Sequence, residues 1–420
     1  MNLINHVLFR FSNKKFMDKN SMLFHSGGIL PQEEMLDVKT AKSSLSIGVP
    51  REHSFQENRV ALCPEGVQLI TDHGHTVFVE RGAGLLAGFR DEEYSEAGAE
   101  IVDEARLVFE SELVLKVAPP TLQEVSNMQN GKTIISALHS TAQTIEYYKL
   151  LMQKKITAFS HEMIKDNVGM FPVLYSMSEI TGYTTVQIAA EYLSKSDYGR
   201  GVILGSVTGI TPTEVVIIGA GTVGEFAARA MLGLGATVKI FDNKLYKLKA
   251  LQSSLGTRLF TSIIHPKVLM KALKTTDILI GALHSKEGRS PVVVSEEMVM
   301  NMKNGSIIID TSIDQGGCVA TSMPTTHHNP VFRFNGVTHY CVPNIPSRVP
   351  RTASYALSNF FTPVLIQIGE AGCVDRFMIR DPGFRQGAYV FNGILTNKMI
   401  GDNFRLPYQD IDLLMAAFLR

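Results

Sequence analysis

The chain has 420 residues, which is long for one domain and predicts two. Forty basic residues balance forty acidic ones, so no excess charge favours nucleic acid or an anionic membrane as a partner. The longest apolar runs, such as Val215–Ala220, are too short to span a bilayer. We therefore expect a globular protein that binds neither nucleic acid nor membrane.

The cysteines and histidines give no sign of a metal site. Cys63, Cys318, Cys341 and Cys373 lack CxxC spacing, and four cysteines are too few for a disulfide framework in a chain of this length. They favour a reducing, cytoplasmic setting. The twelve histidines lack metal-ligand spacing, and the methionines are expected to fill cores. We expect no metal.

Residues 1–45 differ from the rest, because they mix polar residues and isolated aromatics without steady periodicity. Basic residues up to Lys19 would suit a targeting peptide. However, an apolar central region is missing, and acidic residues occur at Asp18 and Glu33. We favour an extension without a targeting role, packed on the body or on a neighbouring subunit.

From Ser46 onward, short apolar runs alternate with helical spacing. A helix is predicted over Pro64–Asp72, with proline at its start. The expected strands or apolar runs are Ser46–Val49, Thr76–Glu80, Leu113–Val117, Thr133–Leu138 and Ile156–Ser160. This alternation predicts an α/β domain with a parallel sheet.

The second half has a clearer strand and helix series. The predicted strands are Val215–Ile218, Thr237–Phe241, Arg258–Ile263, Asp277–Leu283, Ser306–Asp310 and His339–Val342. The predicted helices are Gly224–Gly233, Tyr246–Leu255, Pro266–Thr276 and Ser295–Met302. Alternation with short connections is typical of a doubly wound sheet.

Two further segments indicate how the domains are connected. Tyr175–Tyr192 is expected to cross between them, and helical spacing after Pro350 predicts a return to the first domain. We therefore expect an α/β fold of two Rossmann-like doubly wound domains. A nucleotide-binding domain (174–350) is inserted into a discontinuous substrate domain (46–173 and 351–420).

A glycine pattern lies between a predicted strand and a predicted helix. It fits G-x-G-x-x-G, in which glycines allow a tight turn, close approach of a pyrophosphate and close helix packing. The helix N-terminus would then face the phosphates. The expected cofactor contacts here are Gly219, Gly221, Thr222, Val223 and Gly224. The alternative is a glycine-rich turn in an ordinary α/β domain.

An acidic residue, Asp242, ends the next predicted strand. Its carboxylate can accept hydrogen bonds from ribose hydroxyls and repels a 2′-phosphate, so NAD is favoured over NADP. Lys244 and Lys247 lie nearby, and we include Lys247 among the expected cofactor-binding residues.

Several separate motifs, in one order, make the chain resemble alanine dehydrogenases and the NAD-binding subunit of proton-translocating transhydrogenases. The resemblance covers roughly residues 46 to 361. The motifs are Gly48–Glu52, Glu57–Ala61, Met177–Gly182, Gly199–Val202, the glycine loop and Ile313–Cys318. His139 matches the catalytic histidine of the dehydrogenases, which the transhydrogenases lack. Lys116 matches the first of two family lysines, whereas Ala118 stands at the second position.

The resemblance implies NAD-dependent oxidative deamination of L-alanine to pyruvate and ammonium by a homo-oligomer, a hexamer or a dimer. The alternatives are a related amino-acid or oxo-acid dehydrogenase, or a transhydrogenase-like NAD-binding protein without alanine activity. Ser178 would bind a cofactor phosphate, and Asn344 would bind the nicotinamide carboxamide.

Four side chains are the candidates for chemistry. Arg59 would bind a substrate carboxylate through its fork, unless it pairs with Glu57 or Glu52. Lys116 would assist, unless it forms a buried structural ion pair. His139, after a strand end, suits proton transfer. Asp314 would orient water or ammonia, or bind the ribose, unless it only caps its loop.

Overall fold

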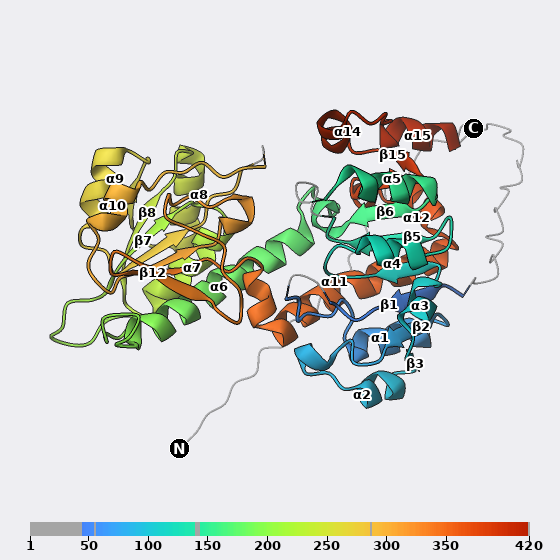
Figure 1. Cartoon of the computed structure of the whole chain (residues 1–420), viewed down its shortest axis with the longest axis horizontal. Coiled ribbons are helices and arrows are strands. Elements are labelled where there is room, and N and C mark those ends of the chain that lie inside the picture. Colours follow the sequence, from blue (N-terminus) through green and yellow to red (C-terminus); the bar gives the residue numbers. More distant parts are fainter. Residues whose placement is uncertain (1–43, 54–55, 139–142, 286–287, 419–420) are drawn as a thin grey trace, which may run out of the picture. The chain divides into compact units, whose positions relative to one another are not determined.

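A computed structural model of the protein describes residues 44–53, 56–138, 143–285 and 288–418. Its strands form two separate sheets (Figure 1). One sheet combines strands from the first 160 residues with a C-terminal hairpin, and the other is built from residues between them. The second sheet is therefore inserted into the chain that forms the first.

The first sheet has the strand order β15-β14-β6-β5-β4-β1-β2-β3. Strands β1 to β6 are parallel, and β14 and β15 are added as antiparallel strands beside β6. The strands are β1 (Ser46–Val49), β2 (Thr76–Glu80), β3 (Glu100–Val102), β4 (Leu113–Leu115), β5 (Thr133–Ser136), β6 (Thr157–Ser160), β14 (Ala388–Phe391) and β15 (Ile394–Leu395). The parallel part has the 3-2-1-4-5-6 order of a doubly wound sheet.

The second sheet has the order β12-β13-β11-β10-β7-β8-β9, in which β12 alone is antiparallel among the described strands. The strands are β7 (Glu214–Ile218), β8 (Thr237–Phe241), β9 (Phe260–Ser262), β10 (Ile278–Gly281), β11 (Ile307–Asp310), β12 (Val331–Phe334) and β13 (Val337–Tyr340). As in the first sheet, the chain starts in the middle, here at β7, and adds strands on both sides, so the strand order reverses between β7 and β10. Ligands of such sheets bind at this point, beyond the carboxyl ends of the strands.

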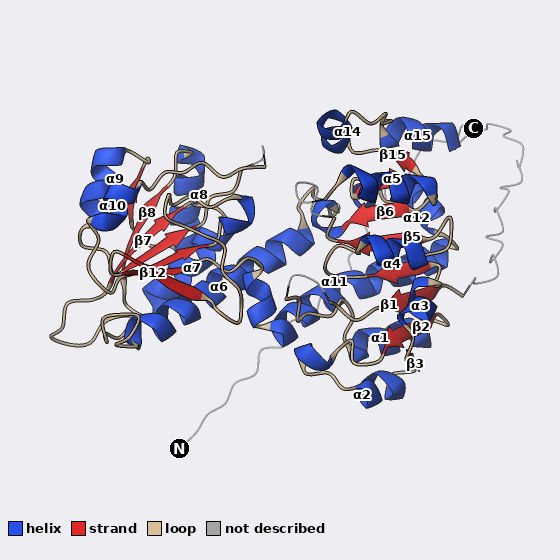
Figure 2. Ribbon diagram, viewed as in Figure 1, coloured by secondary structure: helices blue, strands red, loops and turns tan. Residues whose placement is uncertain are grey.

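Helices cover both sheets (Figure 2). Parallel strands covered on both faces are apolar throughout rather than alternating, as Ile278–Ile280 and Ile307–Ile309 are here, all fully buried. The helices are α1 (Pro64–Asp72), α2 (Asp91–Glu96), α3 (Ala105–Phe109), α4 (Leu122–Asn127), α5 (Ile145–Gln153), α6 (Pro172–Ser194), α7 (Thr222–Gly233), α8 (Leu245–Leu255), α9 (Pro266–Leu273), α10 (Glu296–Met300), α11 (Pro350–Ala371), α12 (Val374–Arg380), α13 (Pro382–Arg385), α14 (Lys398–Phe404) and α15 (Ile411–Phe418).

Two long helices connect the sheets. Helix α6 leads from β6 to β7, helix α11 leads back toward β14, and the two helices pack against each other. Proline begins both helices, at the position where its missing N–H costs nothing. The expected fold of two doubly wound units, one inserted into the other, is confirmed. The exact domain boundaries stay a prediction.

Four strands were not predicted from the sequence, of which β3 is a short edge strand of the first sheet. Strands β14 and β15 lie in the tail, for which only helices were expected, and β12 lies in a segment taken as a connection. The first sheet is therefore mixed rather than purely parallel. The strand predicted over Leu113–Val117 also ends earlier than expected, at Leu115.

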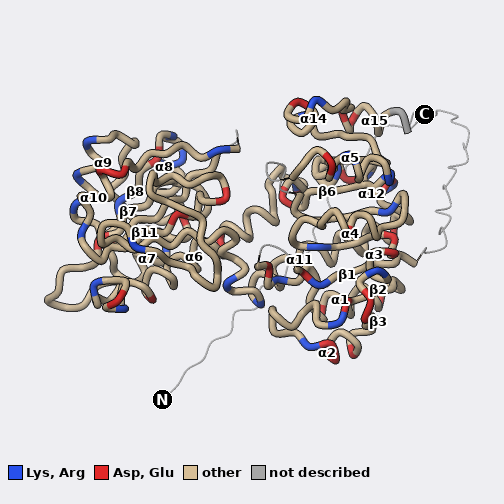
Figure 3. The backbone as a smooth tube through the Cα atoms, in the orientation of Figure 1, with Lys and Arg blue, Asp and Glu red and all other residues tan. Residues whose placement is uncertain are grey.

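Charge is spread evenly over the described residues. Figure 3 shows lysine and arginine interspersed with aspartate and glutamate along both sheets and their helices. Among these helices, none combines the length and the apolar character that crossing a membrane requires.

Gly182 tests the packing of α6 on α7. An added Cβ would lie 2.7 Å from the Phe226 Cβ and 2.8 Å from the Val223 carbonyl oxygen. Although alanine favours a helix by about 1 kcal/mol over glycine, overpacking costs about 1–3 kcal/mol. We expect Gly182→Ala to lower the free energy of unfolding in urea. Gly233→Ala, where an added Cβ meets nothing within 4 Å, is the control and should cause no loss. Equal stability of the two variants would contradict this packing.

Candidate active site

The glycine turn joins β7 to α7. At two of its glycines, Gly219 and Gly224, the surrounding backbone leaves no room for a side chain. Gly219 has a φ of 114°, and a Cβ there would lie 2.2 Å from the Ala282 carbonyl oxygen. A Cβ on Gly224 would lie 2.0 Å from the Gly219 carbonyl oxygen. These contacts hold the strand, the turn and the helix too close for any side chain.

Gly221 is different, because an added Cβ would meet only the Lys247 Nζ, 4.0 Å away. Packing therefore does not explain this glycine. Its open side lies at the start of α7, where the N–H groups of the first turn receive no side-chain cap. An exposed backbone, a helix N-terminus and a lysine fit the pyrophosphate of a dinucleotide.

Asp242 fastens the turn to the next strand. It is buried at the end of β8, where Oδ2 accepts a hydrogen bond from the Ala220 N–H (2.8 Å) and Oδ1 accepts one from the Lys244 N–H (2.7 Å). A carboxylate has about four acceptor sites, so each oxygen keeps one for a ribose hydroxyl. That role stays a prediction.

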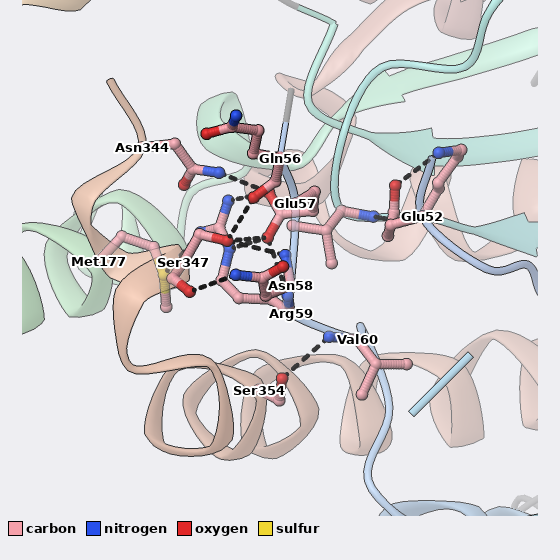
Figure 4. Close-up of polar contacts among 12 residues, drawn as sticks. Glu52, Gln56, Glu57, Asn58, Arg59, Val60, Met177, Asn344, Ser347 and Ser354 are labelled. Atoms are coloured by element: carbon pink, nitrogen blue, oxygen red, sulfur yellow. Dashed lines mark hydrogen bonds and ion pairs between the residues drawn. The ribbon is translucent and has the colours of Figure 1, made fainter. Parts of the chain in front are cut away.

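Arg59 lies in the segment after β1 and forms a buried ion pair with Glu57. Its Nε donates to Oε1 at 2.7 Å, and its Nη2 donates to Oε2 at 2.6 Å (Figure 4). Nη1 donates to the Met177 Sδ at 3.2 Å. Of the five N–H groups of a guanidinium, one on each terminal nitrogen therefore remains. The ion pair fixes the guanidinium and leaves it able to bind one carboxylate.

Glu57 was named in the sequence only as a possible ion-pair partner of Arg59, and the structure shows this pairing, although largely buried rather than at the surface. Burial raises the pKa of Glu57, but the charge of Arg59 and the hydrogen bonds outweigh it and lower this pKa from 4.5 to about 2. The Asn344 Nδ2 also donates to its Oε2, at 2.9 Å. Asn344 has a positive φ of 59° just before the short helix η4 (Ile345–Arg348). Glu57 thus joins a predicted substrate residue to a predicted cofactor residue.

Lys116 follows β4 and is completely buried. Its Nζ lies 2.5 Å from the Glu52 Oε2 and 3.6 Å from the Glu124 Oε1. Burial lowers the pKa of Lys116, but the two carboxylates outweigh this effect and raise it. Burial raises the pKa of Glu52 from 4.5 to about 7, against the opposing charge of Lys116. The ammonium therefore has protein partners, as in the structural alternative, and a direct role toward substrate stays a prediction.

The backbone of Val117, which follows Lys116, is held through both its N–H group and its carbonyl group. The Glu52 Oε1 accepts a hydrogen bond from the Val117 N–H at 2.6 Å, and the Val117 carbonyl accepts from the Ala137 N–H at 3.0 Å. The Nε2 of His161, at the end of β6, also lies 3.0 Å from this carbonyl. The ends of β4, β5 and β6 are thereby tied together beside the buried Ala118. His161 was not singled out in the sequence.

The other predicted site residues differ in how far they are buried. Ser178 is half-buried in α6, next to Met177, which contacts Arg59. Asp314 is exposed in the short helix η3 (Ile313–Gln315) after β11. His139 lies outside the described residues, two positions after Ala137. Within the described residues, no group of three or more histidine, cysteine, aspartate or glutamate side chains is arranged to hold a metal ion.

Two doubly wound sheets, a glycine turn at a strand switch point and a buried arginine define a two-domain α/β protein with a nucleotide-binding domain. Comparison with known families agrees with this class. The N-terminal domain of the family described as alanine dehydrogenase/PNT matches residues 48–181, and its C-terminal domain matches residues 185–398. The chain therefore belongs to the alanine dehydrogenase/PNT family and is an oxidoreductase.

Relatives named alanine dehydrogenase match most of the chain. That of Methanococcus maripaludis is 40% identical over 364 residues, 86% of this chain and 97% of the relative. That of Bacillus subtilis is 39% identical over 363 residues, 86% of this chain and 95% of the relative. A solved L-alanine dehydrogenase has a TM-score of 0.81 and 37% identity, covering 86% of this chain and 99% of that one. A transhydrogenase from Sinorhizobium meliloti, at 23% identity and a TM-score of 0.72, covering 84% of this chain and 99% of that one, shares the fold.

The glycine turn gives a paired prediction. Gly221→Ala should leave the thermal unfolding midpoint nearly unchanged but weaken NADH binding at least tenfold, because the methyl group occupies the side open to a ligand. Gly224→Ala should lower stability, because its Cβ would lie 2.0 Å from backbone oxygen. Fluorescence titration with NADH and thermal unfolding measure both effects. Unchanged NADH affinity in Gly221→Ala would place the pyrophosphate elsewhere.

Lys116 gives a prediction about stability. Lys116→Met leaves Glu52 buried without its cation, and breaking a buried pair costs about 3–5 kcal/mol. The double variant Glu52→Gln, Lys116→Met removes both charges and should recover much of that loss. Lys267→Met, at an exposed position of α9, is the control. Urea unfolding distinguishes the four proteins, and a double variant no more stable than Lys116→Met would refute the ion pair as the cause.

Proposed function

We propose that the protein catalyses the NAD-dependent, reversible oxidative deamination of L-alanine. L-alanine, NAD⁺ and water give pyruvate, ammonium, NADH and a proton. The observation that carries the proposal is the largely buried Arg59, held by Glu57 beside Asn344 with two N–H groups left for a carboxylate. It occurs in a chain 36–40% identical to proteins named alanine dehydrogenase.

The residues proposed to hold NAD fit its parts. The glycine turn and the start of α7 would bind the pyrophosphate, with Lys247 beside Gly221 and Ser178 at a phosphate. Asp242 would accept the ribose hydroxyls, and Asn344 would bind the carboxamide. When bound, NAD⁺ supplies the acceptor for the hydride of the substrate α-carbon.

The substrate would be oriented and deprotonated by this chain's own groups. The remaining N–H groups of Arg59 would bind the substrate carboxylate, since a guanidinium edge matches its geometry. His139 would move the proton on the substrate nitrogen or oxygen. Asp314 would orient the water or the ammonia.

A second candidate, a related amino-acid or oxo-acid dehydrogenase, is favoured by one observation. Ala118 stands where the family places a second lysine, and Lys116 is held by Glu52 and Glu124. Loss of that cation changes the substrate pocket. In either case, we propose that the protein is cytoplasmic, as its cysteines favour, and a homo-oligomer, as the family resemblance implies.

The test is the rate of NAD⁺ reduction by the purified protein with L-alanine at alkaline pH, which favours a reaction that releases a proton. His139→Ala should reduce this rate by about 100-fold or more, because positioned acid–base catalysis contributes that much. A panel of other L-amino acids is the control for the substrate. NADH binding without turnover of alanine but with turnover of another amino acid would favour the second candidate. Binding without any turnover would refute both.

A further inference from the structure

The carboxylate of Glu57 lies where two distant segments of the chain meet. It accepts hydrogen bonds from the Arg59 side chain on one side and from the Asn344 side chain on the other (Figure 4). Glu57 and Asn344 are 287 positions apart in the chain. The first belongs to the segment after β1, and the second follows β13 of the inserted sheet.

The acceptor sites of this carboxylate are filled by the protein. Oε1 accepts from the Arg59 backbone N–H (3.0 Å) and Nε (2.7 Å), and Oε2 accepts from the Arg59 Nη2 (2.6 Å) and the Asn344 Nδ2 (2.9 Å). The Ser347 Oγ also lies 3.3 Å from Oε1, so five donors surround the roughly four acceptor sites of the carboxylate. The side chain is also 2% exposed. Glu57 therefore has no free acceptor site for a ligand and acts only through its neighbours.

Those neighbours are the two groups proposed to hold the two reactants. Arg59 would bind the substrate carboxylate and Asn344 the carboxamide of the cofactor. Both donate to the same oxygen, Oε2. A ligand that binds either side chain further orders the shared carboxylate, and through it the other side chain.

We propose that Glu57 is a positioning residue that couples substrate binding to cofactor binding, because one buried carboxylate orients both Arg59 and Asn344. This inference rests on the proposed function, which supplies the identity of the two ligands. Its consequence is that each ligand binds more tightly when the other is present. By linkage, the factor is the same in both directions.

A second set of hydrogen bonds joins the same two segments through Ser347, whose Oγ also lies 3.3 Å from the Glu57 Oε1. The Asn58 N–H donates to the Ser347 Oγ (2.7 Å), and the Asn58 Nδ2 donates to the Ser347 carbonyl oxygen (3.2 Å). The Ser347 Oγ lies 3.0 Å from the Gln56 carbonyl oxygen. Replacing the carboxylate by an amide of the same shape should therefore leave the segments joined.

The experiment measures coupling in the full-length protein by titrating NADH fluorescence with and without saturating pyruvate. Ammonium is omitted, so that no turnover occurs. In the wild type, pyruvate should lower the Kd of NADH by about fivefold or more, within the usual range of coupling between sites. In Glu57→Gln this factor should fall to within about twofold of unity. A purely structural role would weaken both ligands without removing the factor.

Two further variants sharpen the result. Asn344→Ala removes the amide donor and should lose the coupling to the same extent, and Glu57→Gln added to it should change the factor no further. Asn58→Ala removes only the side-chain hydrogen bond to the Ser347 carbonyl oxygen and should keep the wild-type factor. If Glu57→Gln does not fold, the comparison of Asn344→Ala with Asn58→Ala decides, and equal coupling in those two overturns the inference.

Failure of the inference is distinct from failure of the proposed function. A wild type that oxidises alanine and shows a coupling that Glu57→Gln keeps would overturn the inference alone. A wild type that oxidises alanine but shows no coupling would do the same. A wild type that binds NADH but neither binds pyruvate nor oxidises any amino acid would overturn the proposed function and the inference with it.

Discussion

The ion pair of Arg59 with Glu57 is the interaction on which the candidate site depends. Burying a guanidinium costs several kcal/mol, and a partner compensates only when geometry is good and the remaining donors are used. Here the carboxylate faces the Nε edge of the guanidinium in a two-bond fork, and Met177 takes a further N–H. The arginine is thereby fixed before any substrate arrives, and its other edge is presented for binding.

The buried ion pair of Glu52 with Lys116 differs from that of Glu57 with Arg59 in the donors around its carboxylate. Glu52 faces one ammonium and one backbone N–H, whereas Glu57 faces a guanidinium fork and an amide. Burial raises the pKa of both carboxyl groups. At Glu57 the charge and hydrogen bonds of Arg59 outweigh burial, and the pKa falls to about 2, whereas at Glu52 the charge of Lys116 does not, and the pKa rises to about 7. Glu57 therefore keeps its charge across the physiological range. Glu52 is the carboxylate whose charge is sensitive near neutral pH.

Local patterns predicted much of the fold, because strands such as Thr76–Glu80 and Thr237–Phe241 are covered apolar runs and the glycine turn is a contiguous motif. The C-terminal hairpin was missed although it carries a local signal, since Asn392-Gly393 between β14 and β15 is a typical two-residue hairpin turn. The pairing of β14 with β6, in contrast, joins distant segments. Glu57 and Glu52 were named only as possible partners of Arg59, and their contacts with distant segments were missed. Their partners Asn344 and Lys116 lie 287 and 64 positions away, and no local pattern encodes such pairing.

The absence of a lysine at position 118 has a consequence for how a carboxylate would be held. Lys116 has two carboxylate partners, whereas Arg59 keeps one N–H group on each terminal nitrogen. One remaining N–H on each terminal nitrogen is what a single carboxylate needs for a two-bond contact. Because Glu57 neutralises most of the charge of this arginine, recognition would depend on the direction of those two bonds more than on net attraction. A substrate would then be selected by how well its carboxylate aligns with an arginine that the protein itself holds in place.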